Sequence, residues 1–401
     1  MNSRLVTPRN WQKVLKMSDD QLFKLTPEEQ QLTGQLQNVI REEIAVTDGV
    51  IPFNRYMELA LYYPGLGYYS NPLFKFGAKG DFVTAPMISN LFGHLVARQL
   101  QELIAFGCQP RLLEFGAGNG KLAADILASM GDNLECYWII ELSADLQQWQ
   151  RETLQEKVPQ HLDKVRWLSA LPEQFDGIIF ANEVLDAIPC ELININQTQI
   201  NGVGVAYADN SFVYRDYQLS PSSLEYARNL NLNYTDYQTE IHLAAVLFME
   251  SIANILRHGA ILFIDYGYGA NEYYQPNKTS GTLRGFYHQQ VLDGVLVNPG
   301  LIDITTSVNW SAIATAAIKC DCDFIGYTNQ AGFLVNCGLT ALMDQLHNEL
   351  SAAQYLQLSN QINRLISPNE MGINFKVAGF SKGLEQDEWL GFSDYDLSYA
   401  L

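Results

Sequence analysis

The sequence predicts an α/β fold built around a mostly parallel sheet with helices on both faces. Between residues 111 and 182, short apolar runs alternate with amphipathic segments of helical period. Continuous apolar strands separated by such helices are typical of a parallel sheet that is buried on both faces. The first run ends in "GAGNG" at 116–120, and glycines at every second position let a strand turn directly into a helix beside a ligand.

The composition is that of a folded, acidic protein. The chain has 401 residues, of which 47% are hydrophobic and 17% charged, as in globular rather than disordered proteins. Its 25 basic and 44 acidic residues give a formal net charge of -19. Such a surface repels phosphate backbones, so we expect no nucleic-acid partner. No long, purely apolar run occurs, so we also expect no membrane span.

The N-terminal part begins with a basic segment, which a well-marked helix follows. Residues 1–17 contain basic but no acidic side chains and lack an apolar signal region. We interpret them as the tail or surface helix of a cytoplasmic protein; a presequence for the mitochondrial matrix is the alternative. Thr26 is expected to cap a helix that starts at Pro27, and Glu29 closes a capping box.

The elements of the sheet then follow in order along the chain. Strands are expected at 111–115, 136–142, 165–169, 175–182, 260–268, 322–328 and 373–380. Helices are expected from about 88 and at 120–129, 144–156, 237–257, 310–319 and 339–366. These assignments give a seven-stranded sheet, whose last strand can return antiparallel beside the sixth.

An inserted region interrupts this alternation. Residues 190–218 alternate apolar and polar side chains. Turns are expected at Asn201 with Gly202 and at Asp209 with Asn210, which together predict an antiparallel, lid-like meander.

A second interruption is a long polar segment at 269–308, which is rich in glycine and proline. Loops of this length are usually functional or disordered. The predicted organisation therefore has four parts. These are an N-terminal helical region with a covering loop at 1–87, the first part of the α/β domain at 88–189, the insertion at 190–236 and the second part of the domain at 237–401.

The glycine turn departs from the dinucleotide fingerprint in two ways. Lys121 stands where the third glycine of that fingerprint is expected, and Glu114 precedes the turn. A carboxylate there repels a pyrophosphate but suits S-adenosylmethionine, which carries an ammonium and a sulfonium group and no phosphate. Glu141 ends the next strand and can accept hydrogen bonds from ribose hydroxyls. We therefore expect S-adenosylmethionine rather than NAD, held also by Gly116, Gly118 and Gly120; a tight turn without a ligand is the alternative.

Several motifs resemble the MidA family, and the similarity extends over residues 35–395. They include "PFNRYMELALYYPGLGYYS", "GDFVTAP", "LLEFGAGNGKLAADIL", "FANEVLDAIP" and "PGLIDITTSVNWSAIA". The family contains the mitochondrial complex I assembly factor with protein arginine methyltransferase activity. The resemblance implies a class I methyltransferase sheet with an inserted lid-like region. It also implies methyl transfer to an arginine of a protein substrate, a quinone-module subunit of complex I. A homodimer is compatible with this reading.

The chain departs from the family pattern at two places. Met87 stands where the family usually has glutamate, and Gly285, Phe286 and Tyr287 replace its usual Cys-His-Tyr run. Both places lie in loops that we expect to face the substrate. The substrate can therefore differ even where the cofactor does not.

Acidic side chains follow further strands of the predicted sheet. Asn182 and Glu183 end the fourth strand, Asp186 lies one turn later, and Asp265 lies towards the end of the fifth strand. Ligands of open α/β sheets bind at the carboxyl ends of strands, and a guanidinium pairs well with carboxylates. We therefore predict Glu183, Asp186 and Asp265 as catalytic residues and Asn182 as a cofactor contact. In the alternative reading, Glu183 and Asp186 are acids at a helix start.

The loop "GDFVTAP" is expected to cover the cofactor through Asp81 and Thr84, although an ordinary Gly-Asp turn would explain it too. The histidines show no metal-binding spacing, so we expect no metal. Two other functions stay open. A non-catalytic assembly factor would need the meander at 190–218 but not Glu183 or Asp265. An NAD-dependent oxidoreductase is disfavoured by the residues around the glycine turn.

Overall fold

A computed structural model describes residues 24–73, 84–197, 199–288, 290–292 and 294–401. The basic segment 1–17 and Asp81 lie outside these ranges. The chain forms two compact units. Unit 1 comprises Met1–Phe82, Asp186–Val246 and Ala270–Asn309, and unit 2 comprises Val83–Leu185, Leu247–Gly269 and Trp310–Leu401. Unit 1 thus combines residues from all four parts of the predicted organisation.

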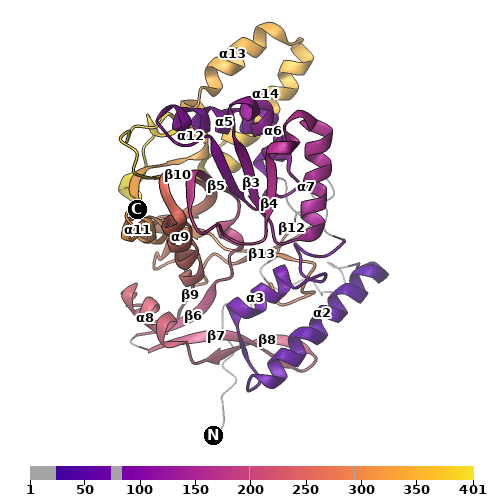
Figure 1. The fold of residues 1–401 in the computed structure, drawn as a ribbon. Coiled ribbons are helices and arrows are strands. Elements are labelled where there is room, and N and C mark those ends of the chain that lie inside the picture. Colours follow the sequence, from indigo (N-terminus) through magenta and orange to yellow (C-terminus); the bar gives the residue numbers. More distant parts are fainter. Residues whose placement is uncertain (1–23, 74–83, 198, 289, 293) are drawn as a thin grey trace. The chain divides into compact units, whose positions relative to one another are not determined.

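Unit 2 contains the expected, mostly parallel sheet (Figure 1). Five strands run parallel. In sheet order they are β4 (Val165–Leu168), β3 (Cys136–Ile140), β2 (Arg111–Phe115), β5 (Phe175–Asn182) and β10 (Leu256–Tyr268). Next comes β16 (Phe375–Lys382), which is antiparallel to both β10 and the edge strand β15 (Asp323–Asn329). The antiparallel return of the last strand is therefore confirmed.

The order of these strands creates a switch point beside β2. The chain proceeds from β2 outward to β3 and β4 and then returns to place β5 on the other side of β2. Ligands of open α/β sheets bind at such a reversal, at the carboxyl ends of the strands. When the two-residue β14 (Val308–Asn309) is included, the sheet counts eight strands, so the expected count of seven is not confirmed.

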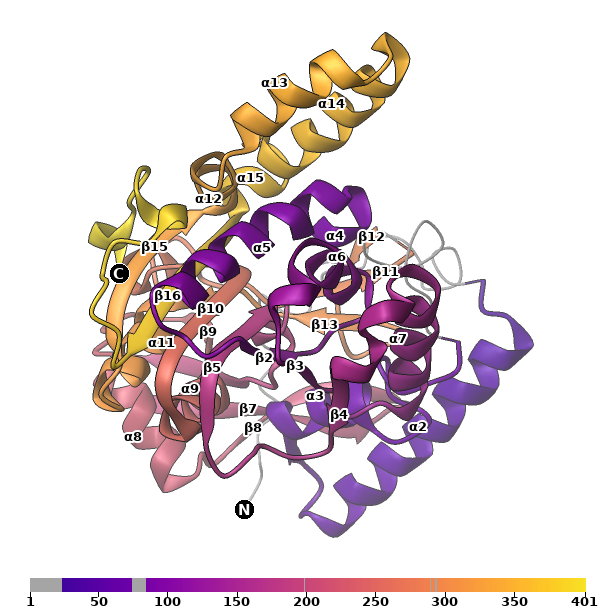
Figure 2. The same cartoon turned by 45° about the horizontal axis from the view of Figure 1, so that its top comes forward.

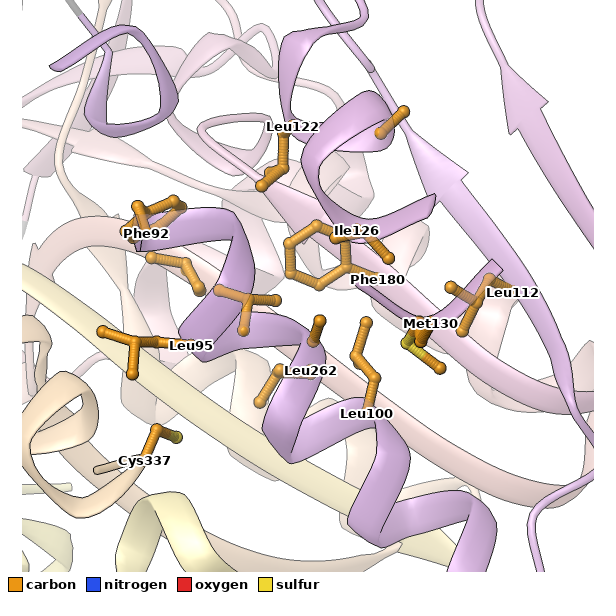
Figure 3. Packing of buried hydrophobic residues seen from close by; sticks show 14 of the residues in the cluster. Phe92, Leu95, Leu100, Leu112, Leu122, Ile126, Met130, Phe180, Leu262 and Cys337 are labelled. Carbon is orange, nitrogen blue, oxygen red and sulfur yellow. The ribbon is translucent and has the colours of Figure 1, made fainter. Parts of the chain in front are cut away.

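Helices bury both faces of this sheet. Figure 3 shows side chains of α5 and α6 packed on strand residues such as Leu112, Phe180 and Leu262. On the other face, Phe115 makes an edge-to-face contact with Phe248 of α9, 5.1 Å between ring centroids. The helices here are α4 (Ala85–Ile88), α5 (Asn90–Ala105), α6 (Lys121–Met130), α7 (Ala144–Lys157), α9 (Leu243–Ile255), α11 (Trp310–Lys319), α12 (Gln330–Asn336) and α15 (Met371–Asn374).

The helical stretch expected at 339–366 is a hairpin of two helices, α13 (Leu339–Glu349) and α14 (Ala352–Ile366). Ser351 caps α14, and its partner Gln354 closes a capping box. Figure 2 shows the hairpin extending away from the sheet of unit 2.

Unit 1 is built from two antiparallel sheets and several helices. The larger sheet contains β1 (Ile51–Pro52), β6 (Glu191–Asn196), β7 (Gln199–Ala208), β8 (Ser211–Tyr217) and β9 (Tyr237–Ile241). The smaller one contains β11 (Arg284–Tyr287), β12 (Gln290–Leu292) and β13 (Asp303–Thr305). The helices are α2 (Pro27–Val46), α3 (Phe53–Tyr62), α8 (Pro221–Asn229) and α10 (Ala270–Tyr273). The capping box of Thr26 and Glu29 is confirmed at the start of α2.

Three local expectations in unit 1 are wrong. Gly202 lies inside β7 rather than in a turn, because a glycine leaves room for the ring of Tyr217 on the paired strand; the turn at Asp209 and Asn210 is confirmed. Residues 237–241 form β9 rather than the start of a helix, because they pair with β6. The long segment 269–308 contributes the smaller sheet.

Among the described residues, no helix is both long and apolar enough to cross a membrane.

Candidate functional site

The glycine turn after β2 has the backbone that the sequence analysis anticipates. Gly116, Gly118 and Gly120 have φ values of 61°, 54° and 80°, a left-handed region that side chains disfavour. A Cβ on Gly116 would lie 2.9 Å from Val184 Cγ2, and one on Gly120 would lie 3.0 Å from the Cα of Gln150. The turn is therefore closely packed against two neighbouring segments and requires glycine at both positions.

Glu114 lies on β2 just before this turn and is buried. Tyr137 donates a hydrogen bond to its Oε2 at 2.8 Å. Burial raises the pKa of Glu114 to about 8; the tyrosine hydrogen bond opposes this shift, and the nearby Glu141 adds to it. Without a neighbouring cation the carboxyl group is therefore largely protonated at neutral pH, and a cationic ligand would favour its ionised form.

Glu141 follows β3 and is held by the start of the next helix. The backbone N–H of Ser143 donates to its Oε1 at 3.0 Å, and the Gln150 side chain donates to its Oε2 at 3.0 Å. Burial raises the pKa of Glu141, while these two hydrogen bonds act in the opposite direction. Gln150 also donates to the carbonyl oxygen of Gly118 at 2.9 Å. The carboxylate and the glycine turn thus share one polar partner, which the sequence analysis missed.

Glu183 stands in a strained turn at the end of β5. Its φ of 56° is unusual for a residue with a side chain. Its backbone N–H donates to the carbonyl oxygen of Ile264 at 2.9 Å, which ties the turn to β10. The Asn182 side chain donates to Glu183 Oε1 at 3.0 Å.

Asp265 holds this turn from the adjacent strand. Its Oδ2 accepts hydrogen bonds from the backbone N–H groups of Val184 at 3.1 Å and Leu185 at 2.8 Å. Its Oδ1 accepts one from the N–H of Tyr266 at 2.8 Å. Asp265 is buried, and its contacts with these backbone groups give it a means of fixing the turn that carries Glu183.

The covering segment is described from Thr84, which precedes α4. On α4, the Met87 sulfur accepts a hydrogen bond from the Asn119 side chain at 3.0 Å, so this helix lies beside the glycine turn. Lys121 forms an ion pair with Asp125, 2.6 Å between Nζ and Oδ2. Its ammonium group is thereby engaged by an acid one helical turn further along α6.

The structure brings most of the predicted site residues together within unit 2. The ends of β2, β3, β5 and β10 carry Glu114, the glycine turn, Glu141, Asn182, Glu183 and Asp265. Asp186 is assigned to unit 1, where it is buried and its carbonyl oxygen accepts a hydrogen bond from the N–H of Thr306 at 3.0 Å.

The donors and acceptors of this edge fit S-adenosylmethionine. The glycine turn keeps Cβ atoms away from an approaching ligand. Glu141 offers carboxylate oxygens of the kind that bind ribose hydroxyls. Glu114 is an acid of the kind that suits a cationic ligand, and Lys121 is paired with Asp125. A pyrophosphate would meet acids at two of the strand ends.

Comparison with known proteins agrees with this geometry. Residues 91–328 match the family model described as "Putative S-adenosyl-L-methionine-dependent methyltransferase". The chain is 30% identical to protein arginine methyltransferase NDUFAF7, mitochondrial, of Mus musculus, over 82% of this chain and 80% of that protein. Its counterpart in Danio rerio is 28% identical, over 82% and 83%.

A solved structure resembles the chain over most of its length. It is a crystal structure of a Burkholderia thailandensis protein bound to S-adenosyl-homocysteine, with 39% sequence identity. The TM-score is 0.87, and the match covers 94% of this chain and 99% of that one.

Proposed function

Because the chain belongs to the family of S-adenosyl-L-methionine-dependent methyltransferases, we propose that it methylates an arginine side chain of a protein substrate. Family, fold class and cofactor agree with the sequence analysis. The arginine acceptor is supported by the names of the curated relatives, which are protein arginine methyltransferases. The observation that supports the proposal is Glu183 itself, an acid with a φ of 56° in a strained turn, whose neighbour Val184 lies 2.9 Å from the position of a Cβ on Gly116.

The cofactor roles follow from the contacts at the strand ends. We assign the ribose hydroxyls to Glu141 and the close approach of the ligand to Gly116, Gly118 and Gly120. Asn182 is the last residue of β5, and the preceding Ala181 pairs with Phe115 of β2. We propose Asn182 as a further contact to the cofactor. When bound, S-adenosylmethionine supplies an electrophilic methyl group, and its transfer to nitrogen leaves S-adenosylhomocysteine and one proton. Asp81 and Thr84 stay predictions.

The acceptor role falls to Glu183. A guanidinium is always charged and pairs with carboxylates through two parallel hydrogen bonds. By holding two nitrogens on one side, Glu183 orients the third nitrogen for reaction, and such positioning can supply much of the rate enhancement. Asp265 acts on the same step by fixing the backbone of the turn. Asp186 stays a predicted second carboxylate.

The function is tested by following the methyl group. The protein is incubated with methyl-labelled S-adenosylmethionine and a protein extract, and the acid hydrolysate is separated into its amino acids. We expect the label in methylated arginine. Label in methyl-lysine or in a base-labile carboxyl ester would replace the arginine acceptor by another one.

A second candidate is the non-catalytic assembly factor that the sequence analysis leaves open. It predicts S-adenosylhomocysteine binding without any methyl transfer, and the same labelling experiment separates it from the enzyme. As the acceptor protein we propose a quinone-module subunit of complex I, which the MidA resemblance implies. The curated relatives are named as mitochondrial proteins, so they do not support the cytoplasmic location that the sequence analysis expects.

A further inference from the structure

Gln150 is a polar side chain in the buried stripe of α7. It lies between Leu146 and Leu154, four residues from each, and all three are buried. Long polar side chains seldom become fully buried unless hydrogen bonds compensate for the lost contact with water. The relative exposure of Gln150 is 0%, so its hydrogen-bond partners show what the residue contributes.

Its amide group joins three segments around the candidate cofactor site. The Nε2 atom donates to the carbonyl oxygen of Gly118 at 2.9 Å and to Glu141 Oε2 at 3.0 Å. The Oε1 atom accepts a hydrogen bond from the indole N–H of Trp167, on β4, at 2.8 Å. Both N–H groups and the carbonyl oxygen of the amide are thereby used.

The three partners allow the amide only one orientation. An indole nitrogen can only donate, whereas a backbone carbonyl and an ionised carboxylate can only accept. A rotation of the amide by half a turn would bring its oxygen against two acceptors and its N–H groups against a donor. Trp167 therefore fixes which end of the amide faces Glu141, and the ring of Trp167 is itself covered by Arg151, 3.8 Å from guanidinium carbon to ring centroid.

We propose that Gln150 is a positioning residue of the cofactor site, which holds Glu141 and the glycine turn in the arrangement that receives the ribose diol. The inference rests on the proposed role of Glu141 toward the ribose. Gln150 donates a hydrogen bond to one oxygen of Glu141, and the N–H of Ser143 donates one to the other. The orientation of the carboxylate is therefore fixed before the ligand binds. Pre-organisation of this kind removes an ordering cost from binding.

The closest packing in the turn supports this role. A Cβ on Gly120 would lie 3.0 Å from the Cα and 3.3 Å from the carbonyl oxygen of Gln150. The backbone of α7 thus touches the turn at Gly120 while the side chain bonds to it at Gly118. A shift of α7 would therefore move the carboxylate and the turn together.

The test compares ligands that differ in one ribose hydroxyl. Calorimetry with S-adenosylhomocysteine and with its 2′-deoxy analogue gives a discrimination ratio for each variant. Gln150→Leu keeps the size of the side chain and removes its hydrogen bonds. We expect it to weaken binding of S-adenosylhomocysteine about tenfold, as for a lost hydrogen bond to a charged group, and to weaken binding of the deoxy analogue much less, so the ratio falls.

A matched control lies on the same helix. Gln148 is exposed, and its side chain donates along the helix to Glu152 at 2.8 Å, so Gln148→Leu should leave both affinities unchanged. In a Glu141→Ala background, Gln150→Leu should cost little further affinity, because the carboxylate that it positions is gone.

Equal losses for both ligands, or additive losses in the double variant, would overturn the proposal and leave Gln150 a packing residue. If Gln150→Leu does not fold, Trp167→Phe removes only the indole N–H; we expect a smaller drop of the same ratio, and an unchanged ratio would also count against the proposal. Failure of the proposed ribose role of Glu141 looks different, because Glu141→Ala would then leave the discrimination ratio of the unsubstituted protein unchanged.

Discussion

Each unit of the molecule buries a glutamate, and the two residues have different surroundings. In unit 1, Glu240 of β9 accepts hydrogen bonds from the backbone N–H groups of Thr282 at 2.8 Å and Leu283 at 2.7 Å. The Tyr273 hydroxyl donates to its other oxygen at 3.0 Å. In unit 2, the carboxyl group of Glu114 receives one hydrogen bond from the described part of the chain, from Tyr137. Burial raises the pKa of both carboxyl groups.

The difference separates a structural acid from one that is available to a ligand. The chain itself surrounds Glu240 with donors, and these donors tie β9 to the segment that leads into the smaller sheet of unit 1. Glu114 keeps acceptor capacity and lies directly before a turn of left-handed glycines. A buried acid with few partners is costly to ionise unless a cation or further donors arrive. The comparison thus supports the proposed ligand site in unit 2.

The largest expected effect is on the glycine turn. Gly118→Val puts a β-branched side chain at a φ of 54°, where such residues are strained and where the ligand approaches. We expect S-adenosylhomocysteine binding to fall by at least about 100-fold, because both the backbone and the free space of the turn are lost. Calorimetry measures this change.

Its control is Gly107→Val, at a φ of 105° that is at least as unfavourable for a side chain but with open space around the added Cβ. That variant should lose stability and keep its ligand affinity. Equal binding losses in both variants would mean that the turn responds to strain alone and is not the ligand site.

The second effect separates cofactor binding from transfer. Glu183→Gln keeps the shape of the side chain and removes its charge, so the affinity for S-adenosylhomocysteine should stay nearly the same. We expect the methyl-transfer rate to fall about 100-fold or more, because the acceptor guanidinium loses its charged partner. Labelled methyl transfer to arginine gives the rate. A wild-type rate in this variant would remove Glu183 from the acceptor site.

The main sheet of unit 2 could be predicted from the sequence, because strands buried on both faces appear as continuous apolar runs. The last strand of the sheet could be predicted for the same reason. The strand β9 was not, because its residues run directly into the helical period of α9, and only pairing with β6 makes 237–241 a strand. Glu240 shows the same limit, since its donors come from residues more than thirty positions away.

The candidate site was predictable where one residue type implies one chemistry. The glycine turn, Glu114 and Glu141 follow from spacing and charge. The distant partners of Asp265 could not be foreseen, because the N–H groups of Val184 and Leu185 lie 81 and 80 residues earlier in the chain. They come near Asp265 through the pairing of β5 with β10. For Gln150 a signal exists: a glutamine lies inside an apolar stripe of helical period, and such a residue needs buried partners.

The third prediction compares the two glutamates through pH. The pKa of Glu114 is raised in the folded state, so between its ordinary value and about 8 the folded protein holds a proton that the unfolded chain has lost. The free energy of unfolding therefore decreases as pH rises through this window. Glu114→Gln should flatten that dependence in urea unfolding from about pH 5 to pH 8. If the slope stays as steep as in the unsubstituted protein, the proton is held elsewhere.

Ligand binding completes this comparison. S-adenosylmethionine should release a proton on binding near neutral pH, and the release should disappear in Glu114→Gln. Calorimetry in buffers of different ionisation enthalpy measures it. Glu240→Gln should lower the free energy of unfolding by about 1–3 kcal/mol, because a buried amide faces donors, yet leave the proton release unchanged. If Glu240→Gln also abolished the proton release, the released proton would come from unit 1, which would contradict its assignment to Glu114.

The smallest effect concerns Met87, where the MidA family usually has glutamate. The Met87 sulfur is a weak acceptor for the Asn119 side chain, 3.0 Å away in the glycine turn. In Met87→Glu a side chain of similar length offers a carboxylate instead, which accepts a stronger hydrogen bond and adds negative charge near a cationic ligand. We expect the affinity for S-adenosylmethionine to rise about two- to fivefold, as for an exposed charge contact.

Met87→Gln supplies the acceptor without the charge and should show less than half of that gain in free energy. The difference between the two variants should shrink in high salt. A weaker affinity in Met87→Glu would mean that the thioether is needed for packing of α4 against the turn, and that the departure from the family pattern does not act through Asn119.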